Sequence, residues 1–139
     1  MNCDRLEVLI AGGGIGGTAT ALLLAETGAR VRLIERVAEP KAIGAAILLQ
    51  PNGLAVLYGL GLGERLRAAG VALRHGTIAD ATGRVILSAP IPDFGDGLDH
   101  ALVLRRSDLL TILLERVAQH PRIASRFGTR GRWQPNGCG

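Results

Sequence analysis

The chain has 139 residues, of which 47% are hydrophobic and 20% charged, which is enough for one globular domain with its own core. Its formal net charge is +4, yet the arginines are scattered and not interleaved with aromatic residues, so the sequence does not indicate a nucleic-acid-binding protein. No apolar run approaches the roughly 18 residues of a membrane-spanning helix, and Cys3 and Cys138 lack the spacing of a disulfide framework or zinc site, so we expect a cytoplasmic chain without a metal.

A glycine-rich turn dominates the first 35 residues. Residues 6–11 are predicted to form a parallel strand buried on both faces, residues 16–27 a helix, and residues 31–35 a second strand. Between the first strand and the helix stands a GxGxxG run made of Gly12, Gly13, Gly14, Ile15, Gly16 and Gly17. A strand, this run, a helix and a second strand that ends in an acid together predict a βαβ unit that binds an adenine dinucleotide.

Three glycines of the run have separate physical roles in such a site. Gly12 permits the tight turn out of the strand, Gly14 lets a pyrophosphate approach the backbone, and Gly17 lets the helix pack closely. The N-terminus of the helix offers free N–H groups and a partial positive charge to the phosphates. We therefore expect the diphosphate to bind at this turn.

The acid at the end of the second strand is Glu35, 23 positions after Gly12. Its carboxylate can accept hydrogen bonds from the ribose hydroxyls, and it would repel a 2′-phosphate, which disfavours NADP. A strand-end acid that only faces water is the alternative. The next residue, Arg36, could stack on adenine or remain solvated, and Glu35 by itself does not separate FAD from NAD.

The rest of the chain is predicted to continue as mixed α/β. We expect strands at residues 45–49, 71–79, 84–88, 101–104 and 122–127, and helices at residues 54–57, 64–69 and 109–118. Residues 71–79 and 84–88 are predicted to form an antiparallel hairpin around a turn at 80–83, and Ser107 with Asp108 offers an N-cap for the last helix. The fold class is α/β, with a Rossmann-like βαβ domain, a parallel sheet and a small antiparallel hairpin.

Two later blocks distinguish FAD from NAD. The first runs from Gly44 through Ala46 to Asn52, and the second is Leu104-Arg105-Arg106-Ser107-Asp108-Leu109. Together with the glycine-rich array they resemble the flavin-dependent aromatic hydroxylases, the class A FAD monooxygenases, over about residues 6–129. The resemblance implies FAD as cofactor, NAD(P)H as reductant, and oxygen transfer to a small aromatic or polyketide-like substrate.

The resemblance also implies roles for two residues of these blocks. Arg106 corresponds to the arginine that reaches the FAD phosphates or ribityl chain, and paired guanidinium donors suit an anionic diphosphate. Arg105 is the competing candidate. Ala46 would lie next to the flavin, at a position where the family commonly has Gly. No catalytic side chain is implied, because the cofactor carries the chemistry.

The chain departs from the family pattern towards its C-terminus. The family's second FAD motif, a Gly-Asp pair downstream of the arginine segment, has no counterpart, and Gly95-Asp96 precedes that segment and is interpreted as a turn. We expect residues 1–127 to form an incomplete FAD-binding domain and residues 128–139 an irregular tail. A chain truncated in this way is expected to be inactive by itself.

Two other hypotheses remain open at the level of the sequence. One is the domain of an NAD- or FAD-linked reductase or dehydrogenase, against which the two later blocks argue. The other is a nonfunctional fragment. The histidines, His75, His100 and His120, lack ligand spacing and are predicted to be solvated or capping residues. The sequence does not indicate an oligomeric state.

Overall fold

The computed structural model describes residues 6–39 and 44–130, which divide into two compact units. Unit 1 consists of Met1–Ala42 and Leu113–Gly139, and unit 2 of Ile43–Ile112. Each unit has its own sheet, so each is described by itself. The mixed α/β class predicted from the sequence, with a parallel sheet and an antiparallel hairpin, is confirmed.

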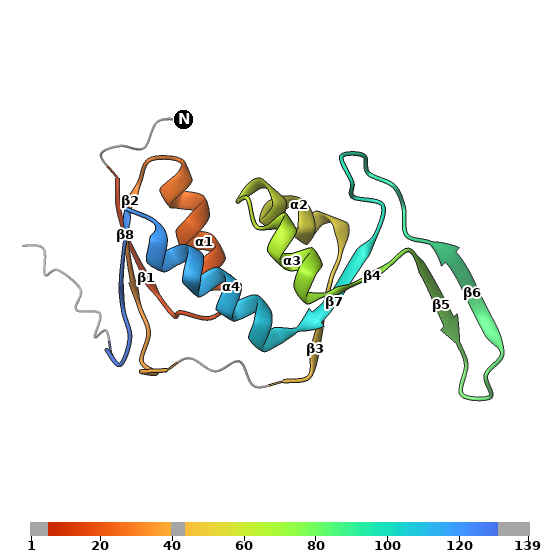
Figure 1. The fold of residues 1–139 in the computed structure, drawn as a ribbon. Helices are drawn as coiled ribbons and strands as arrows, with labels where there is room; N and C mark the ends of the chain where they lie inside the picture. The colour runs from red at the N-terminus through yellow and green to blue at the C-terminus, as the bar shows by residue number, and fades with distance from the viewer. Residues whose placement is uncertain (1–5, 40–43, 131–139) are drawn as a thin grey trace, which may run out of the picture. The chain divides into compact units, whose positions relative to one another are not determined.

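Unit 1 contains a three-stranded parallel sheet. Its elements are β1 (Glu7–Ala11), α1 (Ile15–Glu26), β2 (Arg30–Ile34), the second half of α4 (Arg106–Gln119) and β8 (Ile123–Arg126). The strand order is β1-β2-β8, with Val31 of β2 opposite both Val8 and Ile123. Figure 1 shows α1 and the end of α4 on the same side of this sheet. The predicted βαβ unit therefore forms, and β8, from the far end of the chain, completes the sheet.

The buried face of the sheet in unit 1 is apolar and small. Ala21 and Ala25 of α1 pack on Val31, and Ile10, Leu24 and Ile123 lie at the margin of this cluster. The opposite face is open among the described residues, since Leu9 remains 64% exposed. The prediction that the first strand is buried on both faces is therefore wrong, because in the described residues helices cover only one face.

Unit 2 contains an antiparallel sheet with two helices. Its elements are β3 (Ala46–Leu49), α2 (Pro51–Gly59), α3 (Gly63–Ala69), β4 (Val71–Leu73), β7 (Ala101–Arg105) and the first half of α4. The strand order is β3-β7-β4. Leu54, Leu66 and Leu102, one from each helix and one from the central strand, are almost completely buried. The predicted helices at 54–57 and 64–69 both form and extend beyond those bounds.

Unit 2 also contains a two-stranded ribbon. It consists of β5 (His75–Ala79) and β6 (Val85–Pro90), joined by the predicted turn at 80–83. The single strand predicted at 71–79 is divided at Arg74, because residues before it pair with β7 and residues after it pair with β6. The carbonyl oxygen of Arg74 accepts a hydrogen bond from the N–H of Ile91 at 2.8 Å, which closes the root of the ribbon.

The start of α4 also differs from the prediction. The helix begins at Arg106, directly after β7, so Ser107 and Asp108 lie in its first turn. The N-cap prediction for these two residues is wrong, and the Ser107 hydroxyl instead donates to Asp108 Oδ1 at 3.2 Å. Gly95-Asp96 is a turn as predicted, with both residues at positive φ. Cys3, Cys138 and most of the predicted tail lie outside the described residues. Within them, no helix has the length and apolar character to cross a membrane.

Candidate functional site

The glycine-rich turn after β1 has a backbone conformation that requires glycine at its first position. Gly12 has a φ of +118°, in the region that side chains other than glycine rarely adopt. Its N–H donates to the carbonyl oxygen of Ile34 at 2.8 Å, so the turn is attached to the end of β2. The tight turn predicted at Gly12 therefore forms at the carboxyl edge of the parallel sheet.

The other glycines of the run differ in what surrounds them. A Cβ at Gly17 would collide with the carbonyl oxygen of Gly12 and lie 3.0 Å from its carbonyl carbon, so α1 approaches the turn as closely as glycine allows. A Cβ at Gly14 or Gly16 would meet no atom within 4 Å. Gly14 and Gly16 thus leave open space at the start of α1, where a ligand could approach the backbone.

The N-terminus of α1 is not capped by any side chain. Gly14 is the N-cap residue, and the first turn carries no acidic residue. The Thr18 hydroxyl donates to the carbonyl oxygen of Gly14 at 2.8 Å and makes no capping bond to the free N–H groups. The first N–H groups of a helix lack intrahelical partners and lie at the positive end of the helix dipole. This end of α1 can therefore bind an anion.

Glu35 follows β2 directly and contacts the glycine turn. Its Oε2 accepts a hydrogen bond from the N–H of Gly13 at 2.7 Å, and its Oε1 accepts one from the N–H of Val37 at 2.8 Å. Two hydrogen bonds hold the pKa of the Glu35 carboxyl below its ordinary value. The bond from the Val37 N–H has the largest effect and the bond from the Gly13 N–H the second largest, and both exceed the raising effect of burial. The group is therefore a carboxylate, and its oxygens can accept a further hydrogen bond beside those from backbone N–H groups.

The segment after β8 completes the surroundings of Glu35. The N–H of Thr129 donates to the carbonyl oxygen of Glu35 at 2.9 Å, and Phe127 Cε1 would lie 3.2 Å from a Cβ at Gly13. A hollow of about 380 Å³ lies here, lined by Ala11, Gly12, Ile34, Glu35, Arg36, Thr129 and Arg130. Arg36 is exposed at this hollow. Sequence reasoning missed Phe127, Thr129 and Arg130, although parallel strands end at one edge and the residues after β8 could have been assigned to it.

The remaining predicted site residues are neighbours within unit 2. Ala46 is opposite Arg105 in the ladder between β3 and β7, and Arg106 follows as the first residue of α4. Gly44 has a φ of +137°, and a Cβ there would lie 3.7 Å from Arg106 Cδ. Ala46, Arg105 and Arg106 are all exposed. This cluster thus presents two guanidinium groups beside an open strand end.

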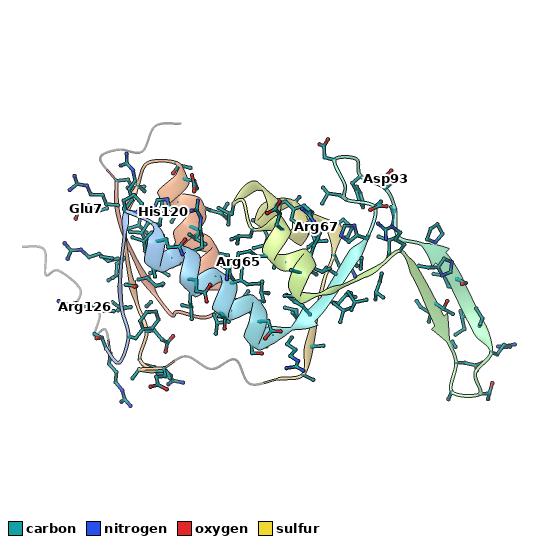
Figure 2. The ribbon with its side chains drawn as sticks, viewed as in Figure 1. Glu7, Arg65, Arg67, Asp93, His120 and Arg126 are labelled. Carbon is teal, nitrogen blue, oxygen red and sulfur yellow. The ribbon has the colours of Figure 1, made fainter. Side chains whose placement is uncertain are left out.

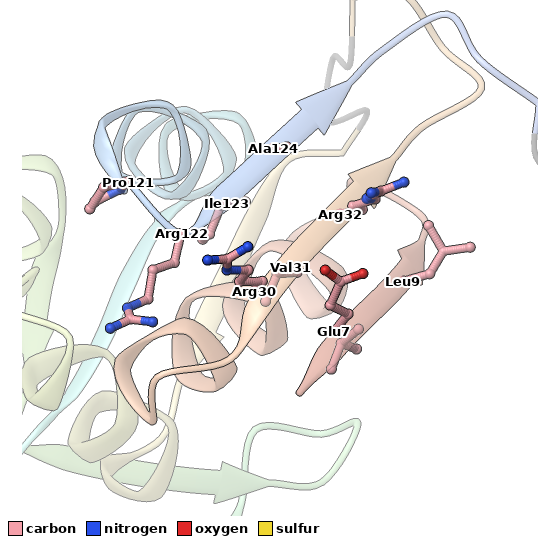
Figure 3. Close-up of a pocket in the computed structure, with 10 residues that line it drawn as sticks. Glu7, Leu9, Arg30, Val31, Arg32, Pro121, Arg122, Ile123 and Ala124 are labelled. Carbon is pink, nitrogen blue, oxygen red and sulfur yellow. The ribbon is translucent and has the colours of Figure 1, made fainter. Parts of the chain in front are cut away.

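A larger hollow of about 700 Å³ lies on the open face of the unit 1 sheet. Figure 3 shows Arg30, Arg32 and Arg122 along it, with Glu7 between β1 and β2. Its lining comes from the beginnings and middles of the strands, whereas ligands of open α/β sheets bind outside their carboxyl ends. We therefore assign the candidate site to the smaller hollow at the glycine turn.

The histidines are not all solvated. His100 is 5% exposed, with Nδ1 2.9 Å from Asp99 Oδ1 and Nε2 3.2 Å from the Tyr58 hydroxyl. His120, labelled in Figure 2, follows α4 and accepts a hydrogen bond from the backbone N–H of Arg122 at 3.2 Å. The expectation of a solvated or capping histidine is therefore wrong for His100. Among the residues that the structure describes, no group of three His, Cys, Asp or Glu could hold a metal ion.

Comparison with known proteins agrees with this geometry. The family described as FAD binding domain matches residues 5–134. The chain is 38% identical over 129 residues to 3-hydroxybenzoate 6-hydroxylase from Klebsiella oxytoca, a match that covers 90% of this chain and 32% of that protein. It is 35% identical over 124 residues to 6-methylpretetramide 4-monooxygenase from Streptomyces rimosus, covering 89% of this chain and 30% of that protein.

The fold is also similar to solved structures. A probable FAD-dependent monooxygenase from Pseudomonas aeruginosa matches with a TM-score of 0.76 and 26% identity, over 90% of this chain and 33% of that chain. The chain therefore spans about a third of the length of the relatives that it matches.

Proposed function

Because this chain belongs to the FAD binding domain family, we propose that it is the FAD-binding part of a flavin-dependent monooxygenase, with unit 1 holding the adenosine diphosphate half of the cofactor. The observation that carries this proposal is the uncapped N-terminus of α1 beside the Glu35 carboxylate. N–H groups that can bind a phosphate lie there beside a carboxylate that can accept hydrogen bonds from ribose hydroxyls, as a nucleoside diphosphate requires.

The glycine turn fits the phosphates. Gly14 and Gly16 leave free the volume that a larger residue's side chain would fill, so phosphate oxygens can reach the N–H groups at the start of α1. The absence of an acidic residue from this first turn removes a charge that would repel them. Gly12 and Gly17 maintain the shape of the turn, so the N–H groups that would bind the phosphates are in position before a ligand arrives.

Glu35 fits the ribose. Its two hydrogen bonds from backbone N–H groups orient the carboxylate and leave acceptor positions for the 2′- and 3′-hydroxyls. Its negative charge disfavours a 2′-phosphate. The neighbouring hollow, lined by Arg36, Thr129 and Arg130, takes the adenine ring in this proposal. The planar guanidinium of Arg36 is the group that would stack on it.

We propose that the unit 2 cluster serves the remaining part of FAD. Arg106 would bind the diphosphate or ribityl oxygens through paired N–H donors, and its exposure leaves those donors accessible. Ala46 would border the flavin. When bound, FAD supplies the redox chemistry by which NAD(P)H and oxygen hydroxylate a substrate. The named relatives are a hydroxylase of 3-hydroxybenzoate and a monooxygenase of 6-methylpretetramide, so we propose a small aromatic substrate for the whole protein. The cytoplasm is the compartment that we propose for it.

Ligand competition tests this proposal. The purified 139-residue chain is titrated with FAD by calorimetry and by quenching of flavin fluorescence. We expect ADP to compete with FAD, because ADP is the half of the cofactor that unit 1 would bind. Glu35→Ala should weaken FAD binding by about 1–3 kcal/mol, the cost of lost hydrogen bonds to a charged group. Glu7→Ala, an exposed acid at the other end of β1, is the matched control and should have no effect.

Two results would refute the proposal. One is a chain that is folded by circular dichroism and binds neither FAD nor ADP. The other is equal FAD affinity in Glu35→Ala and wild type, which would remove Glu35 from the site. Tighter binding of NADH than of FAD would favour the dehydrogenase alternative instead.

A further inference from the structure

Two side chains enclose Gly13, whereas Gly14 and Gly16 face open space. A Cβ at Gly13 would lie 3.0 Å from Glu35 Cβ, 3.3 Å from Glu35 Cγ and 3.2 Å from Phe127 Cε1. The aliphatic part of Glu35 and the ring of Phe127 therefore border the same point of the turn, and any side chain there would crowd both. Because Glu35 Oε2 also accepts the hydrogen bond from the Gly13 N–H at 2.7 Å, the ring lies beside the contact that orients the carboxylate.

Backbone hydrogen bonds fix the chain on both sides of Phe127. Before it, the carbonyl oxygen of Arg126 accepts a hydrogen bond from the N–H of Glu35 at 2.9 Å. After it, the N–H of Thr129 donates to the carbonyl oxygen of Glu35, also at 2.9 Å. Phe127 is thus attached through its neighbours to the backbone of Glu35 itself, so its ring has little freedom to leave the turn.

Phe127 borders the turn but not the hollow beside it. Ile123, four residues earlier, packs on the α1 side of the sheet, and side chains of a strand alternate between its faces, so Phe127 is expected on that side as well. In the described part of the chain, Thr129 and Arg130 line the hollow and Phe127 does not. The half-buried ring therefore supports the turn and leaves the space for a ligand free.

We propose that Phe127 is a positioning residue: it holds the Glu35 carboxylate against the Gly13 N–H and so makes the site selective for a ribose without a 2′-phosphate. The selectivity rests on the proposed function. With the ring in place, the carboxylate is oriented before a ligand arrives, and its charge stays where a 2′-phosphate would lie. Without the ring, the Glu35 side chain can turn towards water. The bond from the Val37 N–H would persist, so we expect a partial loss.

An acid titration of the ligand-free chain, followed by NMR at the Glu35 carboxyl carbon and the Gly13 N–H, tests the positioning role. The bond from the Gly13 N–H lowers the pKa of Glu35, so Phe127→Ala should raise that pKa towards its ordinary value. Phe127→Leu, which keeps a large apolar side chain, should raise it by less. Phe94→Ala is the matched control: it changes the other of the two phenylalanines, which is 66% exposed in unit 2, and should leave the Glu35 pKa unchanged.

Ligand competition tests the selectivity. AMP and adenosine 2′,5′-bisphosphate, which differ only in the 2′-phosphate, each displace FAD from the 139-residue chain. The wild-type chain should prefer AMP. Phe127→Ala should weaken AMP binding roughly tenfold, as for a hydrogen bond to a charged group, and should reduce the preference for AMP. Phe94→Ala should change neither. A loss of stability alone would not alter the ratio of the two affinities.

Three results overturn the inference. The positioning role fails when a Phe127→Ala chain that is folded by circular dichroism keeps the wild-type pKa at Glu35, or when Phe94→Ala raises that pKa equally. Should Phe127→Ala not fold, an unchanged Glu35 pKa in Phe127→Leu overturns it in the same way. The selectivity fails when wild type and Phe127→Ala prefer AMP to the same degree. A wild-type chain that binds neither FAD nor AMP refutes the proposed function, while the acid titration still decides whether Phe127 positions Glu35.

Discussion

Gly17→Ala is the sharpest test of how the glycine turn is built. The added Cβ would collide with the carbonyl oxygen of Gly12 and lie 3.0 Å from its carbonyl carbon. Both are backbone atoms that cannot rotate away, so either α1 moves off the sheet or the turn changes shape. Overpacking of this kind costs about 1–3 kcal/mol. Alanine is more favourable than glycine in a helix by about 0.5–1 kcal/mol, which does not offset an overpacking cost at the upper end of that range.

Gly16→Ala is the matched control, one residue earlier in the same helix. A Cβ there meets no atom within 4 Å, so only the helix preference acts and the unliganded chain should gain up to about 0.5–1 kcal/mol. Urea unfolding followed by far-UV circular dichroism measures both variants. In the proposed function, FAD affinity should fall in both, because the Gly16 methyl occupies space needed by the phosphates. The reasoning fails if Gly17→Ala unfolds at the wild-type urea concentration, or if Gly16→Ala is equally destabilised.

Three further predictions concern other parts of the chain. Because the pKa of Glu35 is held below its ordinary 4.5 in the folded state, its contribution to stability is complete above that pH and lost as the pH falls through the lowered pKa. Glu35→Gln should flatten this acid loss in a series of melting temperatures, and coincident pH profiles would contradict it. Gly70→Ala would place a Cβ 2.8 Å from Leu102 Cγ, and should lower the free energy of unfolding in urea by about 1–3 kcal/mol, whereas an unchanged midpoint would refute the contact. His100→Ala should cost about 1–3 kcal/mol because it removes a buried hydrogen-bonding group, and Tyr58→Phe, which removes one of its two bonds, should cost less in the same assay.

The βαβ unit was predictable because its signals are local. Gly12, Gly17 and Glu35 lie within about one supersecondary unit, and each role follows from backbone sterics or strand order in that unit. The ribbon turn at 80–83 was predictable for the same reason, since Asp80 accepts hydrogen bonds from its near neighbours Thr82 and Arg84. The cofactor roles of Arg36, Ala46 and Arg106 remain predictions that titration can test.

Errors arose wherever a distant segment decided the outcome. The strand predicted at 71–79 is divided at Arg74 because β7 and β6 take different halves of it. Leu9 is exposed because, in the described residues, helices cover only one face of the sheet. The partners in these two cases lie outside the window over which periodicity signals act. The error at Ser107 is local, because β7 passes into α4 without an intervening residue.

The sequence by itself determined the ligand class, because glycine conformation, helix polarity and a strand-end carboxylate are properties of one continuous segment. The tertiary structure alone decided that β8 pairs with β2 and brings Thr129 to the carbonyl of Glu35, which creates the hollow beside the turn. It also decided that the ribbon leaves Ile78 and Leu87 uncovered among the described residues. Such outcomes depend on which strand edges and apolar faces meet, and that is settled by packing between segments far apart in the chain.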